Sequence, residues 1–286
     1  MVNLNDRIII GTAQFANNYG LSKIKNNLEE KHDLLNKIMN YKCHGIDTAI
    51  QYGQAQENIG SWILKNNIYP KIYTKIPGIG SKNDMENIFK KCLNQLKINK
   101  VEGLLIHNQN TWGNNNTKLF AEKLIKSKKI NHIGVSIYDQ KFIPEDSLAS
   151  IIQVPGNIFN YKLLTSKKLE RFINKGGEVH VRSVFIQGLL LMSPHKIPDY
   201  FAKLIKPLKE FHNLCKKNDV NPITLSTGCI FKLIPQCKLV IGIDSIKQLD
   251  KIINKTKIQV SDNIVNEALK IGKQYSSNLW DPRNWS

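Results

Sequence analysis

Short apolar runs alternate with amphipathic segments along the whole chain. The apolar runs cover residues 7–11, 45–48, 71–76, 101–106, 132–136, 151–154, 178–184 and 238–242. Segments with apolar positions at helical spacing cover residues 29–43, 57–65, 83–96, 118–126, 166–174, 200–234 (broken near Asn221-Pro222), 245–253 and 262–271, with a weaker helix at 145–150. Continuous apolar runs between helices are typical of parallel strands buried on both faces, so the pattern predicts an α/β fold.

Eight strand–helix units in a chain of 286 residues are most simply arranged as a closed (β/α)8 TIM barrel. A doubly wound open sheet is the alternative. It is disfavoured because no Gly-x-Gly-x-x-Gly motif follows an early strand and because eight units close naturally. No low-complexity linker interrupts the alternation, and we therefore expect a single domain over residues 1–286.

The composition is basic: 41 Lys and Arg residues against 23 Asp and Glu residues give a net charge of +18. Such a charge can indicate a polyanionic partner, such as nucleic acid or an anionic membrane. The lysines are scattered, however, and the basic stretches, such as residues 126–129, are short and lack interleaved aromatic residues for base stacking. This distribution favours solvated helix faces, and we expect no nucleic-acid or membrane partner.

The cysteines and the hydropathy of the chain indicate in which cellular compartment the protein is found. The five cysteines show no Cys-x-x-Cys spacing, which favours reduced thiols in a soluble cytoplasmic protein. The first residues form no apolar signal segment, and no apolar run is long enough to span a bilayer. His132 and His180 do not join His107 in a metal-binding pattern, so we expect no metal site.

Polar residues end three neighbouring predicted strands. Asp47, Lys75 and His107 each come at the end of an apolar run, and Tyr52 lies on the loop just after Asp47. Reactive groups in a TIM barrel lie at the C-terminal ends of the strands. These four side chains should therefore converge at one mouth of the barrel.

These four residue types suit the reduction of a carbonyl group. Tyrosine has an unperturbed pKa of about 10, and a neighbouring Lys75 ammonium should lower the pKa of Tyr52 by stabilising its phenolate. Asp47 would pair with Lys75 and orient it, while His107 would hydrogen-bond the substrate carbonyl oxygen and share in proton transfer. None of the four can supply a hydride, so a cofactor has to provide it.

The four residues resemble the Asp, Tyr, Lys and His tetrad of the aldo-keto reductases, which falls on Asp47, Tyr52, Lys75 and His107. Further stretches that look like motifs of this family are residues 10–15, 47–53, 57–60, 133–136 and 153–157, so the resemblance covers nearly the whole chain. It implies an NAD(P)H-dependent oxidoreductase that acts on an aldehyde or ketone. The cofactor, usually NADPH, would lie in the barrel mouth.

The resemblance also implies which residues line the cofactor. From the nicotinamide end to the adenosine end these are Thr12, Ser136, Gln153, Arg182, Ser183, Gly188, Gly242, Asp244 and Gln248. Ser136 and Gln153 would hold the carboxamide of the ring. Asp244 would repel a 2′-phosphate but would accept from a free ribose diol. NADPH is therefore expected from the family, and NADH stays open.

Two positions depart from the family's pattern. Ile137 occupies a position where the family often has an asparagine that contacts the carboxamide, and Arg182 occupies the position of an aromatic ring that usually stacks on the nicotinamide. A guanidinium beside the positively charged oxidised ring is unfavourable, so Arg182 should bias the enzyme toward the reduced cofactor. The competing role for Arg182 is to hold an anionic substrate group as a bidentate fork.

Three parts of the chain bear on the substrate and its pocket: residues 182–191, Trp112 and residues 279–285. Residues 182–191 look like a bacterial branch often linked to surface-polysaccharide metabolism, which implies a sugar or nucleotide-sugar carbonyl. Trp112 either lines the substrate pocket or packs its loop, and residues 279–285 either fold over the mouth or anchor the tail. The alternative function is a cofactor-sensing regulatory subunit of the same fold with little turnover. We expect a monomer or a weak homo-oligomer.

Overall fold

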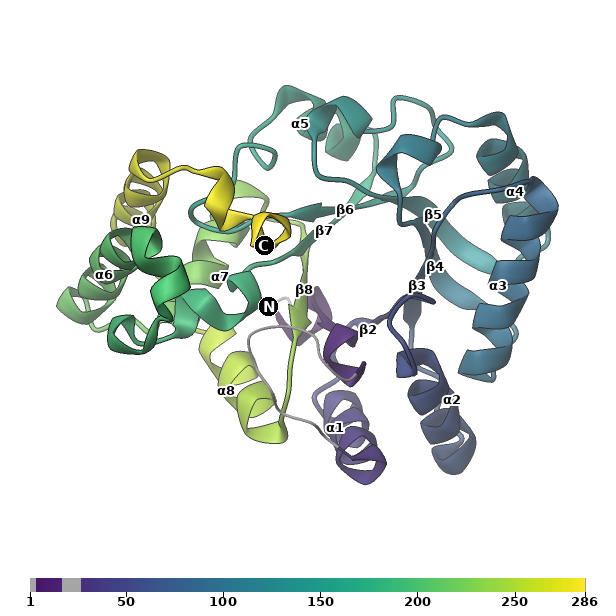
Figure 1. Ribbon diagram of the computed structural model, residues 1–286, viewed down its shortest axis with the longest axis horizontal. Helices are drawn as coiled ribbons and strands as arrows, with labels where there is room; N and C mark the ends of the chain where they lie inside the picture. The colour runs from purple at the N-terminus through teal and green to yellow at the C-terminus, as the bar shows by residue number, and fades with distance from the viewer. Residues whose placement is uncertain (1–3, 17–26, 286) are drawn as a thin grey trace.

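The structure is a computed structural model that describes residues 4–16 and 27–285. In these residues eight parallel strands close into a barrel in sequence order, and helices surround it (Figure 1). The strands are β1 (Ile8–Gly11), β2 (Gly45–Asp47), β3 (Ile72–Ile76), β4 (Val101–Ile106), β5 (Ile130–Ser136), β6 (Ile151–Pro155), β7 (Glu178–Arg182) and β8 (Lys238–Gly242). The predicted single-domain (β/α)8 TIM barrel is confirmed.

The register of the strands brings their ends to one level. β1 is an isoleucine run closed by Gly11, and all of its residues are buried, as expected for a strand covered on both sides. Gly11 pairs with Asp47 of β2 on one side and with Gly242 of β8 on the other. Ser136 of β5 pairs in the same way with Gln153 of β6. These strand ends therefore face a common mouth.

The helices follow the predicted amphipathic segments. They are α1 (Leu28–Asn40), α2 (Ala55–Asn66), α3 (Lys82–Leu96), α4 (Asn115–Lys126), α5 (Lys167–Asn174), α6 (Ala202–Lys217), α7 (Pro222–Leu233), α8 (Ile246–Thr256) and α9 (Asp262–Gln274). Capping boxes begin α1 at Asn27 and α3 at Ser81, where the side chain accepts from a backbone N–H that would otherwise lack a partner. Pro222 begins α7 and explains the predicted break.

Two local predictions were wrong. Residues 145–150 form no helix, because the Asp146 carboxylate accepts from the backbone N–H groups of Leu148 and Ala149 and so competes with helical hydrogen bonding. The seventh strand, predicted to reach Val184, ends at Arg182. Ser183 has a φ of +62°, which an extended strand does not tolerate. The chain therefore turns sharply just beyond Arg182.

The C-terminal segment is held close to the mouth of the barrel. Figure 1 shows this segment, in yellow, passing from α9 toward β7 and β8. The Trp280 ring stacks on Phe159 with 3.9 Å between ring centroids, and both rings belong to an apolar cluster with α6, α7 and α9.

Within the described residues, no helix combines the length and the apolar character that a membrane crossing requires.

Candidate active site

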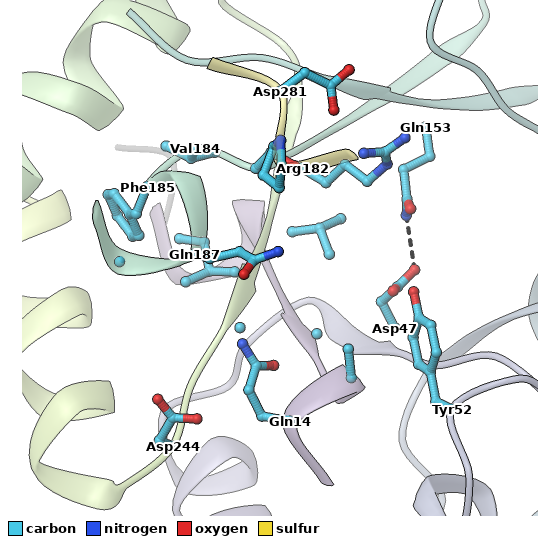
Figure 2. A pocket seen from close by; sticks show the side chains of 18 of the residues that line it. Gln14, Asp47, Tyr52, Gln153, Arg182, Val184, Phe185, Gln187, Asp244 and Asp281 are labelled. Atoms are coloured by element: carbon cyan, nitrogen blue, oxygen red, sulfur yellow. Dashed lines mark hydrogen bonds between the residues drawn. The ribbon is translucent and has the colours of Figure 1, made fainter. Parts of the chain in front are cut away.

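A cavity of about 420 Å³ opens at the C-terminal ends of the strands. Figure 2 shows side chains from β2, β6, β7 and the C-terminal segment around it. The predicted site residues that line it are Asp47, Tyr52, His107, Gln153, Arg182, Ser183, Gly188, Gly242, Asp244 and Gln248. Residues that lie far apart in the sequence therefore meet in one cavity.

A buried ion pair lies at the edge of the cavity. The Nζ atom of Lys75 lies 2.6 Å from Oδ1 of Asp47 and donates a second hydrogen bond to the Thr48 carbonyl oxygen at 3.1 Å. The other carboxylate oxygen of Asp47 accepts from Nε2 of Gln153 at 2.8 Å (Figure 2). The Lys75 and Asp47 side chains are only 1% and 3% exposed, so charge-assisted hydrogen bonds hold both in fixed positions.

Tyr52 and His107 complete the tetrad. The Nζ atom of Lys75 lies 5.2 Å from the centre of the Tyr52 ring. The Tyr52 and His107 rings meet edge to face, with 6.2 Å between their centroids. The structure thus brings the four predicted catalytic residues together, with Tyr52 and His107 toward the cavity and Lys75 behind Asp47.

The prediction of a lowered pKa for Tyr52 was wrong in its overall direction. Burial raises the pKa of Tyr52, and the Asp47 carboxylate raises it further, whereas the Arg182 guanidinium lowers it. The physical reason is burial, which disfavours the charged phenolate more strongly than the nearby positive charge favours it. Tyr52 therefore keeps its proton throughout the neutral pH range.

His107 is neutral as well. Burial lowers its pKa to about 4, and the charges of Lys75 and Arg182 act in the same direction. Nδ1 of His107 lies 2.8 Å from Oε1 of Gln51, and an amide oxygen can only accept, so Nδ1 carries the proton. Nε2 is then an acceptor, suited to bind a hydroxyl group rather than a carbonyl oxygen.

Three predicted residues lie behind the cavity wall. Thr12 is fully buried and donates its hydroxyl to the Asp47 carbonyl oxygen at 3.0 Å. Ser136 is buried at the end of β5, in register with Gln153. Trp112 is 5% exposed and packs in the main apolar core, which is the second of the two alternatives considered for it. None of the three lines the cavity.

Glycines and backbone groups shape the end of the cavity near β8. A Cβ atom on Gly242 would lie 2.1 Å from Nε2 of Gln14, so a larger residue there would displace that side chain. Gly188, with a φ of +92°, has open space where a Cβ would lie. The buried Oε1 of Gln14 has no hydrogen-bond partner among the described residues. This end can therefore take a polar ligand that approaches the backbone closely.

The sequence profile of the Aldo/keto reductase family matches residues 7–272. This chain belongs to that family. The reductase has the fold of the glycerol dehydrogenase AKR11B4 from Gluconobacter oxydans (18% identity, TM-score 0.76, covering 94% of this chain and 92% of that chain). It also has the fold of AKR11C1 from Bacillus halodurans in its holo form (14%, 0.77, 95% and 94%). No curated protein sequence matches it.

A third similar structure is an aldo/keto reductase from Klebsiella pneumoniae in complex with NADP and acetate, with 17% identity, a TM-score of 0.73, and coverage of 95% of this chain and 92% of that chain. Enzymes of this family are NAD(P)H-dependent oxidoreductases that use NADP(H), so the expectation of a nicotinamide-dependent enzyme is confirmed. The residues of the cavity fit such a cofactor, because Gly188 leaves room beside the backbone and the Oε1 atom of Gln14, which has no partner among the described residues, offers a hydrogen-bond acceptor.

Several residues of the cavity were missed from the sequence. Gln14, Tyr138, Asp281 and Arg283 line it, and Gln51 holds His107. Gln14 and Gln51 lie within the stretches 10–15 and 47–53 that resemble family motifs, which was their only signal. Residues 281–283 reach the cavity while Trp280 is buried, so the tail both covers the mouth and is anchored. No group of three or more His, Cys, Asp or Glu side chains in the described residues has the arrangement of a metal site.

Proposed function

We propose that this reductase converts an aldehyde or ketone to the alcohol and that Tyr52 protonates the carbonyl oxygen. The observation that carries the proposal is the position of the Tyr52 phenol in the cavity, next to the buried Asp47–Lys75 pair. Because burial raises its pKa, the phenol holds the proton that the product needs. The bound nicotinamide supplies the hydride.

The neighbours of Tyr52 orient and tune it. The Lys75 ammonium, 5.2 Å from the ring centre, stabilises the negative charge that develops on the phenolic oxygen as the proton leaves. Asp47 holds Lys75 in place through the 2.6 Å contact. Nε2 of His107 accepts a hydrogen bond from a hydroxyl of the substrate, which suits a sugar or nucleotide-sugar carbonyl better than a simple alkyl aldehyde.

We assign the cofactor to the same cavity. Its nicotinamide end is assigned to Gln153 and Arg182, its diphosphate to Ser183 and Gly188, and its adenosine to Gly242, Asp244 and Gln248. Thr12 and Ser136 support this wall from behind and do not contact the cofactor. NADPH is proposed on the usage of the family. The Asp244 carboxylate should weaken the preference for NADPH over NADH, because it repels the 2′-phosphate of NADPH. Five free cysteines are consistent with a cytoplasmic location.

The test is cofactor oxidation, followed at 340 nm, with a panel of aldehydes and sugars. Tyr52→Phe removes only the hydroxyl and should lower kcat by roughly 10²- to 10⁴-fold, the usual contribution of a general acid. The affinity for NADPH, measured by fluorescence titration, should change little, because the phenol lies beside the ion pair and not at the glycine-lined end. Full activity in Tyr52→Phe would contradict the role of Tyr52.

A cofactor-sensing regulatory subunit is the second candidate. The raised pKa of Tyr52 favours it, because a weaker acid donates its proton more slowly. Tight NADPH binding without oxidation of the cofactor by any carbonyl in the panel would support the sensor over the enzyme.

A further inference from the structure

Two arginines from distant segments meet on one aromatic ring in the cavity. The Cζ atom of Arg182, at the end of β7, lies 4.2 Å from the centre of the Tyr138 ring. The Cζ atom of Arg283, in the C-terminal 3-10 helix (Pro282–Asn284), lies 3.3 Å from the same centre. All three residues line the cavity. Stacking on Tyr138 therefore fixes both planar guanidinium groups in position.

The charge of Arg283 is already compensated. Its Nε atom donates to Oδ1 and Oδ2 of Asp281 at 3.1 and 2.9 Å, and its Nη2 atom donates to Oδ2 at 2.5 Å. Burial alone would raise the pKa of Asp281, but the hydrogen bonds from Arg283 hold it below its usual value. Asp281 is therefore ionised and forms a two-point ion pair with Arg283.

Arg182 has no such carboxylate of its own. Its Nη2 atom is buried, and no hydrogen-bond partner for it exists among the described residues. A buried charged donor without an acceptor is costly, and such groups persist where a ligand satisfies them. Figure 2 shows the guanidinium reaching from β7 toward Gln153, on the side of the cavity where Asp47 and Tyr52 lie. Asp244, the other acidic residue of the lining, lies at the opposite end.

The charges at this end of the cavity leave one positive charge uncompensated. Asp47 pairs with Lys75 and Asp281 with Arg283, and the charge of Arg182 also acts on the Asp281 carboxylate. Among the described residues these side chains carry one more positive charge than negative charges. One carboxylate neutralises it, whereas a phosphate dianion would leave an excess negative charge. The fork of a guanidinium also matches the two oxygens of a carboxylate.

We propose that Arg182 binds a carboxylate on the substrate, so that the reductase acts on carbonyl compounds that carry an acid group. Tyr138 and the Asp281–Arg283 pair are positioning residues that hold the Arg182 guanidinium in the lining of the cavity. The proposal rests on the proposed reductase function. It deepens that function by naming the substrate class.

The test compares two aldehydes that differ only in charge, 4-carboxybenzaldehyde and methyl 4-formylbenzoate, with NADPH as reductant. The wild type should show a kcat/KM for the acid roughly 10- to 100-fold above that for the ester, the size of a charge-assisted hydrogen bond. Arg182→Met should bring the ratio close to one, and Arg182→Lys should restore part of it. The ratio is the readout because any effect on cofactor binding acts on both substrates equally.

Arg283→Met is the matched variant for the paired arginine. It should lower the ratio less than Arg182→Met does, because Asp281 already takes up the charge of Arg283. A second pair of substrates, glyceraldehyde 3-phosphate and glyceraldehyde, tests a phosphate group in place of the carboxylate. The ratio of kcat/KM for this pair should be smaller than the ratio for the acid and the ester. An equal kcat/KM for acid and ester in the wild type would overturn the proposal. An acid-to-ester ratio that is unchanged in Arg182→Met would also overturn it. A larger kcat/KM ratio for the phosphate pair than for the acid and ester pair would overturn it as well.

Calorimetric titration of the NADP⁺-loaded protein with 4-(hydroxymethyl)benzoate separates this proposal from the proposed function. Carboxylate binding that is lost in Arg182→Met supports the anion site even if neither aldehyde is turned over, a result that would count against the reductase function alone. Absent binding, or equal binding in the wild type and in Arg182→Met, would overturn the anion site whether or not the protein reduces aldehydes.

Discussion

Tyr52 and His107 lie next to each other in the cavity, and one physical cause keeps both uncharged. Burial disfavours the charged form of any group, so it raises the pKa of the tyrosine and lowers the pKa of the histidine. The cavity therefore contains a neutral phenol and a neutral imidazole between the Asp47–Lys75 pair and Arg182. Proton donation depends on positive charge nearby, and Arg182 lowers the pKa of both rings.

The neutral state of His107 predicts the pH dependence of activity. Because its pKa is lowered to about 4, kcat/KM should fall on the acid side near pH 4 and not near 6.5. Gln51→Glu places a carboxylate beside Nδ1 of His107, which favours the charged imidazole. The acid limb of the pH profile of kcat/KM should therefore move to higher pH. Gln51→Met removes the acceptor without adding charge and is the control. An acid limb at the same pH in wild type and Gln51→Glu would contradict the assignment.

Arg182 should also affect the choice between the two forms of the cofactor. In the cofactor position proposed above, the Arg182 guanidinium would face the nicotinamide, where it opposes the positive oxidised ring but not the neutral reduced ring. Arg182→Tyr should therefore lower the ratio of NADPH affinity to NADP⁺ affinity, measured by fluorescence titration, several-fold. An unchanged ratio would show that Arg182 does not discriminate between the two forms.

At the scale of elements, aromatic side chains anchor the C-terminal segment: Trp285 contacts Phe201, and Trp280 is the more deeply buried of the two. Trp280 is 1% exposed, stacks on Phe159, and donates its Nε1–H to the Tyr275 carbonyl oxygen at 2.7 Å. The residues that follow it bring Asp281 and Arg283 to the cavity. The packing of α6 and α9 against this segment thus determines the composition of the active site.

Trp280→Ala should destabilise the protein by about 3–5 kcal/mol, the usual cost of removing a buried Trp side chain. It should also abolish any effect of Arg283→Met on kinetics, because the segment that carries Arg283 loses its anchor. Trp280→Phe keeps a stacking ring but loses the N–H donor and some buried volume, so its cost should be smaller, about 1–3 kcal/mol. Urea unfolding followed by circular dichroism measures both. Equal stability of the Ala and Phe variants would show that the ring is not the anchor.

At the scale of the whole molecule, titratable groups inside the barrel limit the pH range of stability. His180 is fully buried, with Nε2 bonded to Glu178 at 2.6 Å, and Glu178 also pairs with Lys238. Burial lowers the pKa of His180 and raises that of Tyr73. Burial alone would raise the pKa of Glu178, but its bonds to His180 and Lys238 lower it overall.

The direction of these shifts predicts a stability plateau. A depressed histidine pKa contributes stability above about pH 6.5 that is lost on acidification, and the depressed pKa of Glu178 adds to this loss below about pH 4.5. The raised pKa of Tyr73 contributes stability that is lost above about pH 10. The urea midpoint should therefore be highest between about pH 7 and 10.

Glu178→Gln isolates the contribution of this network. It should cost about 1–3 kcal/mol at pH 8, because a charged acceptor of two hydrogen bonds is lost. It should flatten the profile below about pH 4.5, where Glu178 itself titrates, and steepen the loss of stability below about pH 6.5, because Glu178 raises the pKa of His180. Glu145→Gln is the control, since its pair with Lys168 is exposed and should contribute little. Similar midpoints at pH 5 and pH 8 in the wild type would contradict this account.

Much of the fold follows from short-range patterns. The isoleucine run of β1 and the capping residues Asn27 and Ser81 specify their elements locally, and eight repeated units specify a barrel. The prediction of a helix failed at residues 145–150, because the Asp146 carboxylate accepts hydrogen bonds from backbone N–H groups that a helix would need. The convergence of Asp47, Tyr52, Lys75 and His107 was predictable because parallel strands of a barrel end at the same face.

The sequence by itself thus determined the elements, the barrel and the tetrad, since these depend on periodicity and on topology. Only the tertiary structure decided which side chains reach the cavity: Arg283 does, and Thr12 and Trp112 do not. It also decided the direction of the Tyr52 pKa shift, because the burial of the phenol depends on packing in three dimensions. The meeting of Arg182, Tyr138 and Arg283 has the same origin, since segments remote in sequence are brought together only by the closed fold.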